Sequence, residues 1–339
     1  MIIYILIYFL IVFYLNEILS KKNFLRSNTG HEHQLFVNKS VPLSGGIIFL
    51  MPFVYLLFDS YKLVLISYFF LFILGFLADL NYFTSSKKRF FFQFIIIFIF
   101  INLIKLEVLP TRITAVDNFL QDTYISYIFT IFCFLVLING SNFIDGLNGL
   151  LIGYISIVLF YLYKTSLILS LGVSNDIFWY ILILFLFILF LNFSNKLFLG
   201  DSGAYSLSFL LGFILIKIYN LNNLISPYFI ILLLWYPCFE NLFSIIRKFV
   251  YKSNPLNPDS QHLHQYLFSY IKKKFNFGDL TTNNLSSLII NIFNFFIFFI
   301  AASKLYHTKI QLFLLAICIL TYVLSYKILK KKQKLFKKK

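Results

Sequence analysis

The fold class predicted from the sequence is an all-α integral membrane protein, a polytopic bundle of about 11 transmembrane helices, with 10 as the alternative count. Of the 339 residues, 60% are hydrophobic and only 12% are charged, whereas about a quarter of the residues in a soluble domain are charged. The hydrophobic residues form blocks of about 17–22, the length at which a helix crosses a bilayer. These blocks are apolar all round, whereas the strands of a membrane barrel would alternate.

We predict eleven spans and a single polytopic membrane domain over residues 1–339, because no repeat, low-complexity linker or soluble domain interrupts the apolar blocks. The first block has no basic segment before it and no small-residue cleavage site, so we expect a retained helix rather than a signal peptide. The longest connection, residues 247–284, precedes the last two blocks. In chain order the spans cover about residues 1–19, 42–58, 62–79, 90–108, 123–139, 147–163, 177–193, 203–219, 226–246, 285–303 and 309–328.

Lysine and arginine are distributed unevenly between the two sides of this arrangement. With the N-terminus outside, the inner connections and the C-terminal tail hold 22 of the 29 basic residues. Because basic residues gather on the cytoplasmic side, we predict an outer N-terminus, a cytoplasmic loop at 247–284 and a basic cytoplasmic tail at 329–339. The net charge of +16 is then mainly a topology signal. It favours anionic membrane lipids as partners, and its spread over several loops argues against nucleic acid.

Unusual polar residues gather in five segments, and all five are cytoplasmic in this topology. The segments are HEHQLFVNKSVPLSGG, GFLADLNYFTSSKKRFFFQ, NFIDGLNGL, LFLGDSGAYSLSFLLG and NPLNPDSQHLHQYLF. The outer connections hold acidic residues without comparable clustering. The pattern therefore predicts an active site that faces the cytoplasm. The alternative is a transporter or lipid flippase without transferase activity, whose polar site would usually lie near the bilayer midplane.

Three aspartates, Asp79, Asp145 and Asp201, stand at predicted helix ends. A carboxylate at the middle of a bilayer costs about 2.5–3.5 kcal/mol, and a helix end near the interface avoids much of that cost. Each aspartate also has a simpler interpretation. Asp145 and Asp201 are suited to capping the helices that follow them, and Asp79 is suited to pairing with Lys87 or Arg89.

The combination of acids and histidines indicates a phosphorylated substrate. Carboxylate oxygens suit Mg²⁺, with Mn²⁺ as an alternative, because this ion prefers a few carboxylates together with substrate phosphates and water. Histidine and arginine side chains on neighbouring loops supply further phosphate contacts. His262 and His264 belong to this set, and the simpler interpretation of both is that they are solvated loop residues.

Four motifs together resemble the polyprenyl-phosphate N-acetylhexosamine-1-phosphate transferases, which form glycosyltransferase family 4. The resemblance covers nearly the whole chain and keeps the family order of motifs. NFIDGLNGL (142–150) is similar to Asn-x-x-Asp-Gly-x-x-Gly-Leu, and FLGDSG (198–203) is similar to Gly-Asp-x-Gly. PDSQHLHQ (258–265) resembles the Asp-x-x-His-x-His-His loop, and PLSGG (42–46) resembles Pro-x-x-Gly-Gly.

Two positions depart from the family pattern. The family usually has two aspartates at the end of the third span, and here Ala78 replaces the first and Asp79 keeps the second. Gln265 replaces the last histidine of the loop, although glutamine can still donate hydrogen bonds. These changes leave open a catalytically inactive relative that acts as an assembly partner. The missing first aspartate, at Ala78, also favours direct attack by the lipid phosphate over a covalent aspartyl intermediate.

The resemblance implies a reaction at the bacterial inner membrane, with the active site facing the cytoplasm. A UDP-N-acetylhexosamine and polyprenyl (undecaprenyl) phosphate would give polyprenyl-diphosphate-sugar and UMP, with Mg²⁺ as cofactor, and so initiate a cell-surface glycan. His262 and His264 favour the branch that begins O-antigen or teichoic-type glycans over the muramoyl-pentapeptide branch. Glu240 stands where that branch often has an acid, and its simpler interpretation is an interfacial residue facing Arg247. UDP-GlcNAc is the default donor, and a homodimer is compatible with the resemblance.

The resemblance also implies roles for individual residues. The metal ligands would be Asp201, Asn142 and Asp145, and the catalytic residues Asp79, Asp145 and Asp201. Asp79 would orient or deprotonate the lipid phosphate. The implied substrate-binding residues are Asn142, Asn148, Gly200, Lys88, Arg89, Asp259, His262 and His264.

Overall fold

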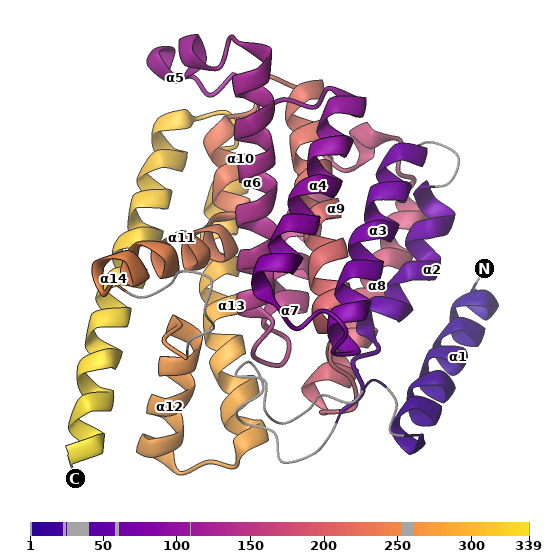
Figure 1. Ribbon diagram of the computed structural model, residues 1–339, viewed down its shortest axis with the longest axis vertical. Helices are drawn as coiled ribbons and strands as arrows, with labels where there is room; N and C mark the ends of the chain where they lie inside the picture. Colours follow the sequence, from indigo (N-terminus) through magenta and orange to yellow (C-terminus); the bar gives the residue numbers. More distant parts are fainter. Residues whose placement is uncertain are drawn as a thin grey trace.

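The computed structural model describes residues 2–22, 25, 41–57, 61–108, 110–252 and 260–338. In this part of the chain all the regular secondary structure is helical apart from a single bridge residue, Pro42. Most of the helices run side by side along the long axis of the molecule (Figure 1). The short helix α5 lies at one end of the bundle, and α12 lies near the other end together with the C-terminus.

The helices follow one another with short connections in most places. They are α1 (Ile2–Lys21), α2 (Gly45–Leu57), α3 (Lys62–Asp79), α4 (Ser86–Ile104), α5 (Thr114–Phe119), α6 (Thr123–Ile144), α7 (Leu150–Lys164), α8 (Asn175–Phe193), α9 (Gly200–Leu221), α10 (Pro227–Leu233), α11 (Trp235–Val250), α12 (Leu263–Phe275), α13 (Asp279–Ser303) and α14 (Thr308–Lys338), with a short 3-10 helix, η2 (Leu169–Leu171).

The all-helical prediction is confirmed, and each predicted span overlaps a helix. Among the described residues, six helices are long and apolar enough to cross a membrane, or seven if α10 and α11 together form one broken span. These six are α3, α6, α8, α9, α13 and α14, and α7 is a shorter apolar helix. The crossing of all eleven spans and the orientation of the termini stay predictions.

The prediction of one continuous ninth span over 226–246 is wrong, because α10 and α11 meet at an angle of 75°. Figure 1 shows α11 lying across the bundle. The break falls just before Pro237, which lacks a backbone N–H and is tolerated in the first turn of a helix. α11 also buries Glu240, Arg247 and Lys248, so a straight continuation of α10 would carry these charged side chains along the bilayer normal.

The predicted loop 247–284 contains a helix, α12, and the first turns of α13. The helix α12 begins with a capping box, in which the Gln265 side chain accepts a hydrogen bond from the His262 backbone N–H at 3.1 Å. Its length of 13 residues is too short to form an apolar membrane block, so these residues did not appear as a predicted span.

The helix α9 lies at the centre of the bundle. In the most apolar stretch of α9, 78% of the residues are buried inside the protein, whereas the corresponding share in α14 is only 22%. α9 packs against α2, α3 and α6, and it carries small buried side chains, Ser202, Ser206 and Ser208. Because α9 begins where α3 and α6 end and where α4 starts, its first turn meets three polar segments that are far apart in the sequence.

Candidate active site

Asp79, the last residue of α3, holds the first turn of α9. Its carboxylate accepts hydrogen bonds from the backbone N–H groups of Asp201 at 2.8 Å and Ser202 at 3.1 Å. The first N–H groups of any helix lack partners within the helix. Asp79 therefore acts as a cap from another helix, and it fixes the backbone on which the Asp201 side chain stands.

Glycines permit this close approach of α3 to α9. A Cβ at Gly75 would overlap the backbone of Asp201 and Ser202. Gly200 has φ +77°, and a Cβ there would lie 2.7 Å from a carboxylate oxygen of Asp79. Both positions therefore need glycine, the first for space and the second also for its backbone conformation.

We expect Gly75→Ala to lower the midpoint of thermal unfolding, because the added methyl group meets backbone rather than a movable side chain. Overpacking of this kind costs about 1–3 kcal/mol, and a displaced Asp201 would lower turnover by about 10²-fold. Circular dichroism and a product-release assay measure the two effects. Gly278→Ala is the control, since a Cβ at Gly278 meets nothing within 4 Å. Equal unfolding midpoints for the two variants would contradict the packing argument.

The Asp201 side chain is the point where three helices meet. Its carboxylate accepts hydrogen bonds from Asn142 Nδ2 in α6 at 2.6 Å and from the Tyr205 hydroxyl in α9 at 3.2 Å. Arg89 in α4 forms an ion pair with the same carboxylate. Arg89 and Asp201 are each between one fifth and one quarter exposed, at 24% and 22%, so the pair is accessible from one side.

Asp145 lies in the turn between α6 and α7, beside the other two aspartates. Burial raises the pKa of the Asp145 carboxyl well above its usual range, and the charges of Asp201 and Asp79 raise it further. A hydrogen bond from the Gly200 backbone offsets part of this rise. Three carboxylates thus share one region that, in the described part of the chain, contains one ion-paired cation, Arg89.

A second polar cluster joins α11 to α12. Glu240 and His262 are almost fully buried, with 1% and 2% of their side chains exposed, and Nδ1 of His262 lies 2.8 Å from a Glu240 carboxylate oxygen. The ring of His264 stacks on His262 at 5.5 Å. Phe143, beside Asn142, contacts His262 with ring centroids 5.0 Å apart. This cluster therefore borders the aspartate region through the end of α6.

Sequence comparison places this geometry in a family. The chain matches the model of Glycosyl transferase family 4 over residues 61–219. It is 30% identical over 266 residues to the probable undecaprenyl-phosphate N-acetylglucosaminyl 1-phosphate transferase of Bacillus subtilis, covering 76% of this chain and 69% of that protein. The chain belongs to glycosyl transferase family 4.

Other relatives carry two kinds of name. The chain is 31% identical over 242 residues to phospho-N-acetylmuramoyl-pentapeptide-transferase of Prochlorococcus marinus, covering 62% of this chain and 66% of that protein. It is 30% identical over 145 residues to undecaprenyl-phosphate alpha-N-acetylglucosaminyl 1-phosphate transferase of Thermotoga maritima, covering 42% and 43%. The matched segments therefore span about two thirds or less of these relatives, and both branches of the family are represented.

In this family 4 protein the structure brings together most of the residues that the sequence predicted. Asp79, Asp145, Asp201, Asn142 and Arg89 form one region. Lys88 is exposed on the first turn of α4, and its neighbour Arg89 is the residue that pairs with Asp201. Asp259 lies outside the described residues.

The simpler interpretations of the aspartates are wrong. The residue that precedes α7 is Gly149, and Asp145 instead follows the end of α6. Asp201 stands in the first turn of α9 and bonds to side chains of other helices rather than capping its own. Asp79 bonds to backbone N–H groups, not to Lys87 or Arg89. The expectation of solvated histidines is also wrong, because His262 and His264 are buried.

The contact expected between Glu240 and Arg247 is likewise replaced. Glu240 pairs with His262 across the two helices, while Arg247 donates a hydrogen bond to Ser244 at 3.0 Å. The break before α11 turns this helix across the bundle, and Glu240 on it faces the start of α12.

Sequence reasoning missed a set of asparagines around the turn 145–149. Asn283 accepts a hydrogen bond from the Asn148 backbone N–H at 2.7 Å, and Asn192 accepts one from Gly149. Asn291 donates to the Gly149 carbonyl at 2.9 Å. Since the Asn148 side chain also bonds to Asn195, Asn148 holds the turn in place. Runs of asparagine inside apolar blocks were the available signal.

Among the described residues, no group of three or more His, Cys, Asp or Glu side chains is arranged to hold a metal ion. The predicted ligand set contains only two carboxylates and one amide: Asp201, Asp145 and Asn142. A magnesium ion that is held in part by substrate phosphates needs only one or two protein carboxylates. The donor types therefore fit Mg²⁺. A cation would also offset the repulsion among the three neighbouring carboxylates.

Proposed function

We propose that this protein transfers an N-acetylhexosamine-1-phosphate from a UDP-sugar to polyprenyl phosphate and so initiates a cell-surface glycan. The supporting observation is the convergence of Asp79, Asp145, Asp201, Asn142 and Arg89 at one end of the helix bundle. The names of the relatives support the same class of reaction. The proposal includes the orientation in which this end faces the cytoplasm at a bacterial inner membrane.

The proposed reaction is a direct displacement at phosphorus. An oxygen of the polyprenyl phosphate forms a bond to the sugar-proximal phosphorus of the donor. The bond from that phosphorus to the bridging oxygen breaks, and its electron pair leaves with UMP. Arg89 is suited to hold a phosphate oxygen, because its guanidinium reaches the centre of the site and is partly exposed.

Asp79 has a different role from the one implied by the resemblance. Both of its oxygens already accept backbone N–H groups of α9, so we assign it as a positioning residue for Asp201. Asp201, Asp145 and Asn142 would hold Mg²⁺, with Mn²⁺ as an alternative. The bound ion would offset the charge that develops on the pyrophosphate.

The test is release of UMP by the purified protein from UDP-GlcNAc, with polyprenyl phosphate and Mg²⁺. A donor panel that includes UDP-N-acetylmuramoyl-pentapeptide separates the two branches of the family, and we expect turnover with UDP-GlcNAc. Absence of UMP release with every donor would contradict the proposal, and it would favour the transporter or the inactive relative.

Neighbouring basic residues on α4 provide a matched pair for this assay. We expect Arg89→Gln to lower UMP release by about 10²-fold, because an amide cannot supply the charge that holds a phosphate. Lys87→Gln removes a positive charge from an exposed position of the same helical turn and should leave the rate close to wild type. Equal rates for the two variants would remove Arg89 from the proposed role.

A further inference from the structure

Two cavities adjoin each other, and the three lysines that line the second lie at the opposite ends of the helices that build the Asp201 site. Lys62 begins α3 and Asp79 ends it, which separates them by about 25 Å at 1.5 Å per residue. Lys217 follows Asp201 by four and a half turns of α9, or about 24 Å. Lys105, directly after α4, is similarly distant from Arg89. The lysines therefore cannot contact a phosphate that is bound at the Asp201 site.

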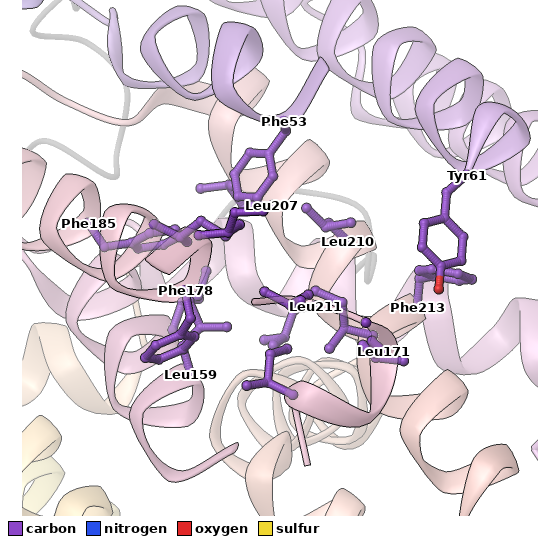
Figure 2. Close-up of a pocket in the computed structure, with 17 residues that line it drawn as sticks. Phe53, Tyr61, Leu159, Leu171, Phe178, Phe185, Leu207, Leu210, Leu211 and Phe213 are labelled. Atoms are coloured by element: carbon purple, nitrogen blue, oxygen red, sulfur yellow. The ribbon is translucent and has the colours of Figure 1, made fainter. Parts of the chain in front are cut away.

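The first cavity is apolar and has a volume of about 230 Å³. Figure 2 shows its labelled side chains, which surround the space from several helices and include Phe53, Leu159, Phe178 and Leu210. An apolar cavity of about 150 Å³ is enough to bind a molecule of the size of benzene. The space is therefore large enough for a segment of hydrocarbon chain.

The second cavity is basic and has a volume of about 480 Å³. It shares Tyr61 and Phe213 with the first, and three lysines line it: Lys62, Lys105 and Lys217. No acidic residue is among those that line it. In the described part of the chain none of these lysines forms an ion pair within 4.0 Å, so their charges attract an anion.

We propose that the two cavities together bind one anionic glycerophospholipid, with its phosphate among the three lysines and an acyl chain in the apolar cavity. Charge complementarity supports the headgroup, since each basic residue near an anionic lipid attracts it. The continuity of the two cavities through Tyr61 and Phe213 supports a ligand that is polar at one end and apolar at the other. The proposal rests on the membrane crossing of α3 and α9, which places this site in the leaflet opposite to the proposed transferase site.

The test is native mass spectrometry of the full-length protein in detergent with phosphatidylglycerol or phosphatidylcholine at equal concentration. We expect the wild type to retain one phosphatidylglycerol molecule in preference to phosphatidylcholine. The double variant Lys105→Gln/Lys217→Gln should weaken phosphatidylglycerol binding by about fivefold for each lysine lost. Leu171→Trp, which fills the apolar cavity, should weaken the binding of both lipids.

The matched control is Lys304→Gln/Lys309→Gln, which removes two exposed lysines at the same end of the bundle but outside the cavities, and it should bind like the wild type. Equal retention of the two lipids by the wild type, or unchanged phosphatidylglycerol binding in Lys105→Gln/Lys217→Gln, would overturn the proposal. Displacement of phosphatidylglycerol by undecaprenyl phosphate at equal concentration would also overturn it. UMP release is a separate measurement, so its loss or presence does not decide this result.

Discussion

Asp201→Asn is expected to lower UMP release by at least about 10³-fold, the scale on which charge-stabilising groups act in phosphoryl transfer. The substitution keeps the size of the side chain but removes the negative charge at the point where α4, α6 and α9 meet. The amide can no longer balance Arg89, and it is a poor ligand for Mg²⁺ in comparison with a carboxylate. The product-release assay with UDP-GlcNAc measures the effect.

A thermal-unfolding titration separates loss of metal binding from loss of fold. Mg²⁺ should raise the unfolding midpoint of the wild type, because a ligand that binds only the folded state stabilises it. The same titration should leave the midpoint of Asp201→Asn unchanged. Asp176→Asn is the control, since Asp176 also stands in the first turn of a helix but is exposed. Near wild-type turnover by Asp201→Asn would exclude Asp201 from the proposed chemistry.

Asp145→Asn is expected to lower turnover strongly and, at the same time, to stabilise the metal-free protein. Turnover should fall by about 10²–10³-fold, because the site loses one of its two predicted carboxylate ligands. The gain in stability follows from burial, which raises the pKa of the Asp145 carboxyl above its value in the unfolded chain. Such a carboxyl favours folding while it is protonated, and that contribution is lost as the pH rises through the folded pKa.

The pH dependence of the unfolding midpoint tests whether the ionised Asp145 carboxyl destabilises the metal-free protein. In EDTA, the unfolding midpoint of Asp145→Asn should exceed that of the wild type by more at pH 8 than at pH 5, because asparagine does not ionise. Asp122→Ala is a control of the opposite sign, since Asp122 caps α6 by accepting hydrogen bonds from two backbone N–H groups. Alanine cannot accept them, and the loss of such a cap destabilises by about 1 kcal/mol. A variant of Asp145 that is less stable than the wild type at pH 8 would contradict the argument.

The helices could be located from composition because the requirement for an apolar segment of bilayer length acts on local sequence. The break between α10 and α11 could not, because both halves are apolar enough to pass as one span. The angle of 75° depends on what α11 packs against, including the start of α12. The helix α12 escaped for the opposite reason, since it is short and polar.

The candidate site could be predicted as a set of residues but not as a set of contacts. Aspartates at helix ends on one predicted face indicated Asp79, Asp145 and Asp201, and the structure places them together. Nothing in the sequence distinguished Arg89 from Lys88. Adjacent residues on a helix point in different directions, and the packing of α4 decided that Arg89 is the one that reaches Asp201. The asparagines that hold the turn after α6 come from α8 and α13, and they were hidden within apolar blocks.

The sequence by itself therefore determined the helical class, the approximate helix positions and the polar residues that stand at helix ends. The reason is that polar groups are costly inside a bilayer, so they are excluded from long apolar segments and remain at their ends. Only the tertiary structure decided the partner of each polar side chain. Asp79 bonds to the backbone of Asp201, 122 residues later in the chain, and Glu240 pairs with a histidine 22 residues away. Such pairings depend on how helices pack, and glycines such as Gly75 set how closely two of them approach.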